Sequence, residues 1–306
     1  MTSMGFFFKK DSMSKIVCFG EVLWDVFPTH KKIGGAPLNV ANRLQVLGNE
    51  VTMISAIGED KNGEKLLNYI KEVGINPSCI QVHNEYKTGK VKVMLNEKGS
   101  ASYDIKYPRA WDKIRLTEIN KSAVKSADAF VYGSLAARDD SSKGTLNKLL
   151  DLAKYKIFDL NLRTPYYTKY LLIKLMNEAD FIKFNDDELY EVSAYLGSKY
   201  RSMEQNIRFI SQKTNTKHIC VTKGHHGAVL MYDDKFYYNS GYIIKVIDTV
   251  GAGDSFLGSL ISQLLNKVNP QESIDFACAV GAMVAQSEGA NPKISKKEIE
   301  AFINPY

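Results

Sequence analysis

The sequence lacks the features of membrane proteins and of nucleic-acid-binding proteins. No apolar run approaches the roughly 18 residues needed to span a membrane, and GFFFKK, residues 5–10, is too short for a signal-peptide core. The net charge of +6 comes from 40 basic and 34 acidic residues, which are spread along the chain without a sustained basic run. We therefore expect no membrane partner, no nucleic-acid partner and a cytoplasmic location.

Cysteine is scarce, and its spacing argues against two further kinds of site. The four cysteines are Cys18, Cys79, Cys220 and Cys278. They are far apart, so none forms the paired spacing of a zinc site or a dithiol redox site. We expect them to be buried thiols of a reducing compartment.

Two common phosphate-binding motifs are also missing. No G-x-x-x-x-G-K-[ST] sequence occurs. The segment GAGDSFLG, residues 251–258, has the wrong spacing for G-x-G-x-x-G and lies late in the chain. These absences argue against a P-loop protein and against a nicotinamide-dependent oxidoreductase.

Apolar runs of two lengths alternate along most of the chain. The short runs predict buried strands, and the longer runs with helical spacing predict helices between them. This order predicts an α/β fold, a doubly wound and mostly parallel sheet with helices on both faces. The predicted strands include residues 15–22, 51–58, 128–133, 156–163, 180–185 and 217–224, and the predicted helices include 38–48, 63–74, 142–154 and 271–289.

The alternation is interrupted between residues 88 and 112. Apolar and polar residues alternate there on both sides of the turn-like NEKG, residues 96–99, which predicts a β-hairpin with one wet face. Because there is no low-complexity linker and no internal repeat, we expect one domain over residues 15–306 that carries this hairpin as a small β lid. Residues 1–14 fit no element and are expected to be an extension.

The stretch DTVGAGDSFLGSL, residues 248–260, predicts an anion site. Its Gly-Ala-Gly segment, residues 251–253, leaves the backbone free of bulky side chains where a helix over residues 255–265 is expected to begin. Several amide N–H groups can therefore point outward together. A helix cap would explain Asp254 alone. An anion site with its own base also explains the small residues, because phosphoryl transfer needs a carboxylate to take the proton of the attacking hydroxyl.

This stretch resembles the C-terminal signature of the ribokinase-like sugar kinases, the phosphofructokinase B type. Their N-terminal signature is present as GGAPLNVANRLQVLG, residues 34–48. The resemblance covers residues 15–303. It implies a lid in two parts, at about residues 23–36 and 88–112.

The resemblance also implies a set of functional residues, with ATP as the phosphate donor. Asp254 would be the base that activates a sugar hydroxyl, while the backbone of Gly251, Ala252 and Gly253 would stabilise charge on the moving phosphate. The sugar-binding residues would be Asp25, Gly34, Gly35, Asn39, Arg163 and Asp254, and the nucleotide-binding residues would be Asn185, Thr222, Gly224, Gly251 and Gly253.

Two cation sites are implied as well. Asn185 and Glu188, in NDDE, would organise Mg²⁺ through water, and a helix cap is an equal explanation for Asn185. Asp248 matches the aspartate that helps to hold potassium in some members. Lys293, in EGANPKIS, stands close to where some members have serine. Its ammonium group either replaces the charge of the cation or points into solvent, so potassium dependence stays open.

The acceptor is expected to be fructose, phosphorylated at its 6-hydroxyl, because GGAPLNVA and DLNLRTPYY most resemble the bacterial fructokinases. 2-Keto-3-deoxygluconate is the alternative, since Arg163 could meet its carboxylate. Ribose and nucleosides come third. A catalytically inactive sugar- or nucleotide-binding protein is the non-enzyme alternative, but such a protein is expected to lose Asp254 or the glycine turn, and both are present. A homodimer formed through the lid is a further hypothesis.

Overall fold

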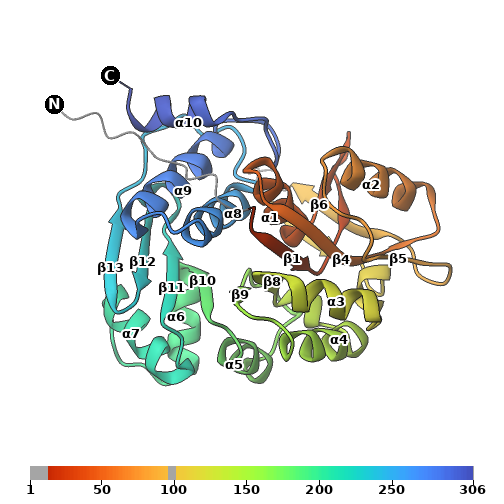
Figure 1. The fold of residues 1–306 in the computed structure, drawn as a ribbon, viewed down its shortest axis with the longest axis horizontal. Helices are drawn as coiled ribbons and strands as arrows, with labels where there is room; N and C mark the ends of the chain where they lie inside the picture. The colour runs from red at the N-terminus through yellow and green to blue at the C-terminus, as the bar shows by residue number, and fades with distance from the viewer. Residues whose placement is uncertain (1–12, 96–100, 306) are drawn as a thin grey trace.

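The main sheet contains the parallel strands that the alternating pattern predicts. The computed structural model describes residues 13–95 and 101–305. Within these residues the main sheet has nine strands, in the order β13-β12-β11-β10-β9-β8-β1-β4-β5 (Figure 1). Neighbours from β11 to β5 pair in parallel, whereas β12 and β13 pair antiparallel at one edge. The strands are β1 (Lys15–Phe19), β4 (Glu50–Gly58), β5 (Ile80–His83), β8 (Ala129–Gly133), β9 (Lys156–Asp159), β10 (Phe181–Asn185), β11 (His218–Thr222), β12 (Ala228–Tyr232) and β13 (Lys235–Asn239).

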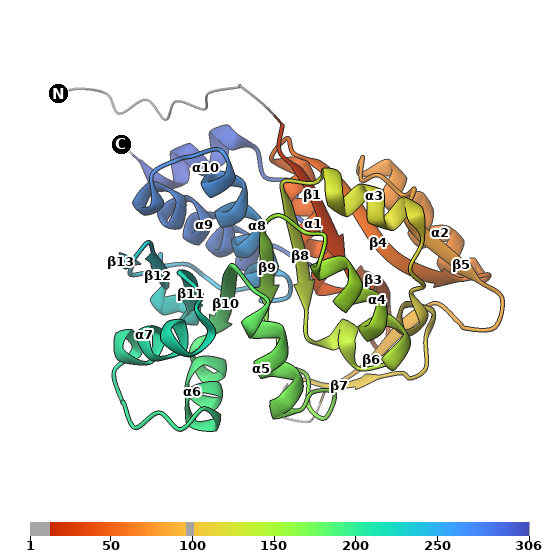
Figure 2. The same ribbon diagram turned by 60° about the horizontal axis from the view of Figure 1, so that its bottom comes forward.

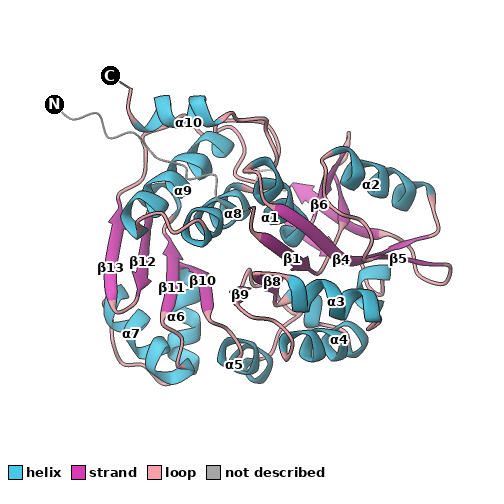
Figure 3. Ribbon diagram, in the orientation of Figure 1, coloured by secondary structure: helices cyan, strands magenta, loops and turns pink. Residues whose placement is uncertain are grey.

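Helices cover both faces of this sheet, which confirms the predicted doubly wound α/β fold (Figure 2, Figure 3). One face packs against α1 (Ala36–Val46), α2 (Lys61–Glu72), α8 (Ala252–Leu265) and α9 (Pro270–Ala285), with α10 (Lys296–Ile303) on α9. The other face packs against α3 (Glu118–Ser126), α4 (Asp140–Leu150), α5 (Lys169–Asn177), α6 (Asp186–Tyr195) and α7 (Met203–Thr214). In the described ranges no helix has the length and hydrophobicity to cross a membrane.

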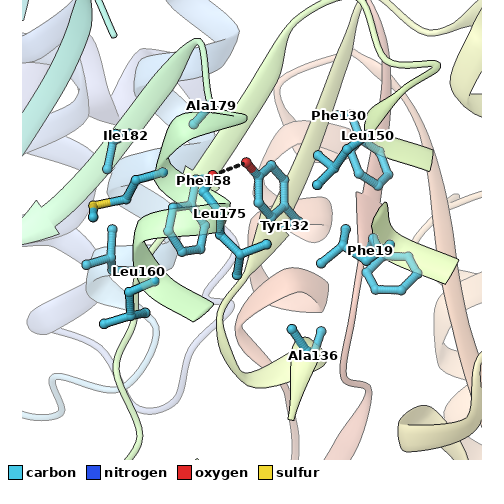
Figure 4. Packing of buried hydrophobic residues seen from close by; sticks show 14 of the residues in the cluster. Phe19, Phe130, Tyr132, Ala136, Leu150, Phe158, Leu160, Leu175, Ala179 and Ile182 are labelled. Carbon is cyan, nitrogen blue, oxygen red and sulfur yellow. Dashed lines mark hydrogen bonds between the residues drawn. The ribbon is translucent and has the colours of Figure 1, made fainter. Parts of the chain in front are cut away.

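Side chains from alternate strand positions enter separate cores on the two faces of the main sheet. In β1, Phe19 lies in the core beneath α3 to α7, and Cys18 lies in the opposite core. Figure 4 shows the first of these cores, where the rings of Tyr132 and Phe158 stack with centroids 5.1 Å apart. The Tyr132 hydroxyl donates a hydrogen bond of 3.0 Å to the carbonyl of Leu175. This packing fixes the strands whose carboxyl ends carry the polar residues described below.

A second sheet, called the lid sheet below, pairs two segments that are far apart in the sequence. Its order is β3-β2-β6-β7, formed by β2 (Leu23–Val26), β3 (Lys31–Gly34), β6 (Gly89–Leu95) and β7 (Ala101–Ile105). Parallel pairing of β2 with β6 joins the two segments that were expected to form a lid. Antiparallel pairing of β6 with β7 confirms the hairpin, but its turn at 96–99 lies outside the described residues. The expected extension, residues 1–14, also lies outside them except for its last two residues.

Helices α1 and α8 pack closely against each other. A Cβ atom added to Gly258 of α8 would lie 3.0 Å from Cβ of Arg43 and 3.1 Å from the carbonyl oxygen of Val40. Past the end of α1, the Asn49 side chain donates a hydrogen bond of 2.9 Å to the Ser262 hydroxyl. The two helices therefore form one packed unit on the sheet.

Candidate active site

Two cavities lie at the carboxyl ends of the parallel strands, where open α/β sheets usually bind ligands. The first cavity has a volume of about 290 Å³ and is lined from β2, from α1 and from the loops that follow β1 and β9. The second cavity has a volume of about 440 Å³ and is lined from the ends of β10 and β11 and from α8 and α9. Lys183, Thr249 and Gly253 line both cavities, so the two cavities meet at these residues.

The first cavity brings together the residues predicted to bind a sugar. Gly34 lies behind Asp25, where a Cβ atom would collide with the carboxylate oxygen Oδ2 of Asp25. Only glycine therefore lets this carboxylate lie where it does. The predicted residues that line the cavity are Asp25, Gly35, Asn39, Arg163, Gly251, Gly253 and Asp254.

The N-terminus of α8 lies at the junction of the two cavities. The helix was expected to begin near Ser255 but begins at Ala252, so Gly253 and Asp254 belong to its first turn. Gly251 precedes the helix with φ of +76°, in the left-handed region that favours glycine. Amide N–H groups in a first turn have no carbonyl partner within the helix, and the helix dipole is positive at this end. This arrangement can hold an anion, as the sequence predicts.

A chain of hydrogen bonds holds the carboxylate of Asp254. The Asn39 side chain donates to Oδ2 of Asp254 at 2.8 Å, and the Asn291 side chain donates to Oδ1 of Asn39 at 2.9 Å. The amide of Asn39 is thus oriented from behind by Asn291. Asn39, which was expected to contact sugar, therefore also positions the predicted base.

Burial raises the pKa of three carboxyl groups that line the first cavity. The pKa rises to about 6 for Asp254, to about 6 for Asp25 and to about 7 for Glu21. Repulsion from Asp254 adds to the rise at Asp25 and Glu21, and repulsion from Asp159 adds to it at Asp254. The guanidinium of Arg163 opposes the rise in all three. A carboxylate with a pKa near 6 is ionised at neutral pH and remains basic enough to accept a proton.

The second cavity has the lining that a nucleotide needs. Apolar side chains on one side, among them Ile244, Val246 and Phe256, offer a surface to a flat ring. The cavity also reaches Gly253 at the N-terminus of α8, where phosphates would meet N–H groups. The predicted nucleotide residues that line it are Asn185, Thr222, Gly224 and Gly253.

Asn185 and Glu188 form the helix cap that was weighed as an alternative to a metal site. The Asn185 side chain accepts a hydrogen bond from the Glu188 N–H at 2.8 Å, and Glu188 accepts one in return from the Asn185 N–H at 2.8 Å. The other oxygen of Glu188 accepts from the Leu162 N–H at 2.8 Å. In the described part of the chain no group of three or more His, Cys, Asp or Glu residues could hold a metal ion. A role in organising Mg²⁺ stays a prediction.

A lysine that the sequence did not single out faces Asp248. The ammonium of Lys32, on β3 of the lid sheet, lies 3.5 Å from Oδ2 of Asp248, whereas Lys293 is exposed. The same oxygen accepts a hydrogen bond of 3.0 Å from the Gly289 N–H, and Oδ1 accepts one of 3.0 Å from the Val250 N–H. The charge of Asp248 is thus compensated from the lid sheet.

Comparison with known proteins identifies the family. The model of the pfkB family carbohydrate kinases matches residues 8–297. The chain belongs to this family. The kinase is 28% identical to fructokinase-2 of Solanum lycopersicum over 313 residues, covering 92% of this chain and 94% of that protein. The fold also matches two solved structures. Fructokinase from Vibrio cholerae O395, in a fructose, ADP and calcium ion bound form, has a TM-score of 0.82 at 23% identity and covers 96% of this chain and 100% of that one. Fructokinase from Xylella fastidiosa with bound ATP has a TM-score of 0.84 at 22% identity and covers 96% and 99%.

Four site residues of the kinase escaped the sequence-based prediction. Lys32 and Asn291 act on residues far away in the chain, so no local pattern marks them. Glu21 and Lys183 are charged residues in or directly after apolar runs that were interpreted only as strands. A lone charged residue in a buried strand was the available signal, because such a group needs a partner or a function.

Proposed function

We propose that this carbohydrate kinase transfers the γ-phosphoryl group of ATP to the 6-hydroxyl of fructose. The observation that carries the proposal is the meeting of two cavities beside Asp254 and the N-terminus of α8. One cavity is polar enough for a sugar, and the other suits a nucleotide. The similarity to fructokinase-2 of Solanum lycopersicum supports fructose as the acceptor.

In this mechanism the sugar lies in the first cavity with its reacting hydroxyl at Asp254. The carboxylate of Asp254 takes the hydroxyl proton as the sugar oxygen forms its bond to the γ-phosphorus. The bond between that phosphorus and the oxygen bridging to ADP breaks, and ADP leaves with the bonding electron pair. The N–H groups of Gly251 and Gly253 donate hydrogen bonds to the phosphoryl oxygens, where negative charge must be stabilised. The N–H of Ala252, which was predicted to join them, already donates to the carbonyl of Thr249 at 3.3 Å.

The remaining residues of the first cavity hold the sugar. Asp25, Asn39 and Arg163 offer acceptors and donors to adjacent hydroxyls, and the backbone at Gly34 and Gly35 adds to them. A buried site of this kind rejects a wrong sugar because its own polar groups are then left unpaired.

The charges of the first cavity favour a neutral sugar over the alternative acceptor, 2-keto-3-deoxygluconate. Glu21, Asp25 and Asp254 line the cavity, against Arg163 and Lys183. The carboxylate of a sugar acid would meet repulsion from these acidic groups. A neutral ketohexose avoids this repulsion.

Mg²⁺ is proposed to enter with ATP and to offset the charge of the triphosphate. Thr222 and Gly224 would contact the nucleotide, and Asn185, with Glu188 behind it, would orient the water around the ion. Because Asn185 lines the second cavity and Glu188 fixes its backbone, the capping geometry is compatible with this role.

We also propose that potassium is dispensable, because the Lys32 ammonium already supplies a positive charge beside Asp248. Replacing potassium by tetramethylammonium should leave kcat within about twofold. A much larger fall would contradict this assignment and would identify Asp248 as part of a monovalent cation site.

The test is a coupled ADP-release assay with Mg-ATP against fructose, 2-keto-3-deoxygluconate, ribose and adenosine, run beside Asp254→Asn. Turnover with fructose, a phosphate found on its 6-oxygen by NMR, and a loss of about a hundredfold or more in the variant would support the proposal. Asp140→Asn is the matched control, because Asp140 lies in the first turn of α4 and is exposed. Turnover with another sugar would change the acceptor. No turnover with any sugar would favour the inactive binding protein, and full activity of Asp254→Asn would exclude Asp254 as the base.

Two further properties are proposed with their tests. The edge strands β3 and β7 leave the lid sheet open to pairing, which supports a homodimer through it. A monomeric mass by light scattering would contradict the dimer.

All four cysteines are free and buried, which supports the cytoplasm as the location. Fractionation of the native cells, with the kinase outside the cytoplasmic fraction, would contradict it.

A further inference from the structure

Lys183 is a buried lysine at the junction of the two cavities. Of the cavity-lining residues in the described part of the chain, it is the only lysine or arginine that lines both cavities. Its side chain is only 8% exposed. A Cβ atom on Gly253 would lie 3.7 Å from the Lys183 ammonium, so the charge lies directly beside the first turn of α8.

The sheet fixes the position of this ammonium. Lys183 is the central residue of β10 and lies opposite Asp159 of β9. The ammonium forms an ion pair of 3.1 Å with Oδ1 of Asp159, whose other oxygen is buried and has no hydrogen-bond partner among the residues that the structure describes. Only one bond is thus made to a carboxylate, and ammonium carries three donors, so donors remain for a ligand.

The charge of Lys183 is secure at neutral pH. Burial alone would lower the pKa of its ammonium, but the carboxylates of Asp159, Glu188 and Asp254 outweigh burial and raise the pKa above its ordinary value. Burying a charged group costs desolvation free energy. If Lys183 served only to pair with Asp159, two apolar residues could replace the pair with little loss of stability. An ammonium retained where two substrate cavities meet calls for a ligand of opposite charge.

We propose that the Lys183 ammonium contacts the phosphoryl group at the junction of the two cavities and stabilises the charge on its oxygens during transfer. Asp159 is the positioning residue that holds the ammonium there. This inference rests on the kinase reaction proposed above and adds to it a side-chain cation opposite the N–H groups of α8. The phosphoryl group passes between Lys183 and Gly253, while Asp254 acts on the sugar hydroxyl.

The test uses a double variant because Lys183→Met alone leaves Asp159 buried and unpaired, which can unfold the protein. In Lys183→Met with Asp159→Asn, both charges are removed together. We expect this double variant to fold, to keep its KM for the sugar and for ATP, and to lose about a hundredfold or more in kcat, the loss typical of removing one donor to a developing charge. Lys156→Met is the control, because Lys156 also lies in a strand and forms an ion pair, with Glu178.

A second measurement separates this inference from the choice of sugar. Binding of ADP, and of ADP with tetrafluoroaluminate as a mimic of the transferred group, is measured by calorimetry in Mg²⁺ without and with each sugar. We expect the double variant to bind ADP as the wild type does and to lose about a hundredfold in affinity for the mimic. A wild type that turns over no sugar but shows this difference would refute the proposed function and keep the role of Lys183. A folded double variant with near wild-type kcat, or with undiminished affinity for the mimic, would overturn the role of Lys183.

Discussion

Removing the charge of Asp254 should stabilise the fold while it abolishes catalysis. Burial and repulsion raise the pKa of this carboxyl from 3.8 to about 6, so the ionised form is disfavoured in the folded state. At about 1.4 kcal/mol for each pKa unit, this difference corresponds to about 3 kcal/mol at neutral pH. Since Asp254 is half-buried and water screens part of the penalty, we expect Asp254→Asn to gain about 1 to 3 kcal/mol.

The stability that Asp254→Asn gains over the wild type should depend on pH in a defined direction. A carboxyl group whose pKa is raised on folding binds its proton more tightly in the folded state, so the wild type loses stability as pH rises from about 4 through about 6. Asparagine cannot ionise and avoids this loss. The difference between variant and wild type should be largest above pH 7, shrink as pH falls through 6 and vanish near pH 4.

Urea unfolding at pH 8 and at pH 5, followed by the fluorescence of the two buried tryptophans, measures this difference. Asp140→Asn is again the control, because it removes a carboxylate from the first turn of another helix but from an exposed position. We expect this control to be neutral or slightly destabilising. If Asp254→Asn were destabilised at pH 8 like a lost helix cap, the carboxylate would be stabilising α8 and the argument from burial would be refuted.

Three further perturbations have defined outcomes. Asn291→Ala should lower kcat about tenfold with little change in the KM for ATP, because Asn39 loses the bond that orients it toward Asp254, and steady-state kinetics measure both constants. Gly34→Ala should raise the KM for sugar by about tenfold or more, because the new methyl group displaces the Asp25 carboxylate, and calorimetric sugar binding would show an unchanged affinity if this were wrong. In the wild type, log kcat/KM should fall with a slope of at least one below about pH 6 as Asp254, and with it Asp25, is protonated, and a flat profile down to pH 5 would contradict the role of Asp254 as the base.

The fold was largely predictable because its signals are local. The run predicted as a strand over residues 51–58 is β4, Glu50–Gly58, since a short apolar run between helical runs has few other ways to be buried. The start of α8 was predicted three residues late because glycine was expected to precede a helix. Glycine in a helix costs only about 1 kcal/mol relative to alanine, which the packing of a buried helix outweighs, and α8 includes Gly253.

The candidate site was predicted only where its residues share a motif. The glycine turn and Asp254 are adjacent in the sequence, whereas Asn291 meets Asn39 across 252 positions. Lys183 and Asp159 each look like an ordinary charged residue of a strand. Their pairing exists only once β9 and β10 lie side by side, which no local pattern specifies.

The close fit of α1 against α8 has a consequence for how acceptor preference can be changed. A methyl group at Gly258 would fit only if Arg43 and Val40 moved by a few tenths of an ångström, so a residue larger than alanine between these helices would shift α8, which carries the predicted base. Substitutions along α1 that accommodate a new sugar would therefore also move Asp254 and the N–H groups at the start of α8. The lid sheet reaches the same cavity through Leu23, Asp25 and Val91. Although Trp24 packs in the core of α1 and α8, Leu23 and Val91 lie in a separate small core. Directed evolution of acceptor preference should find its tolerated substitutions in β2 and β6, and those on α1 should be eliminated together with activity.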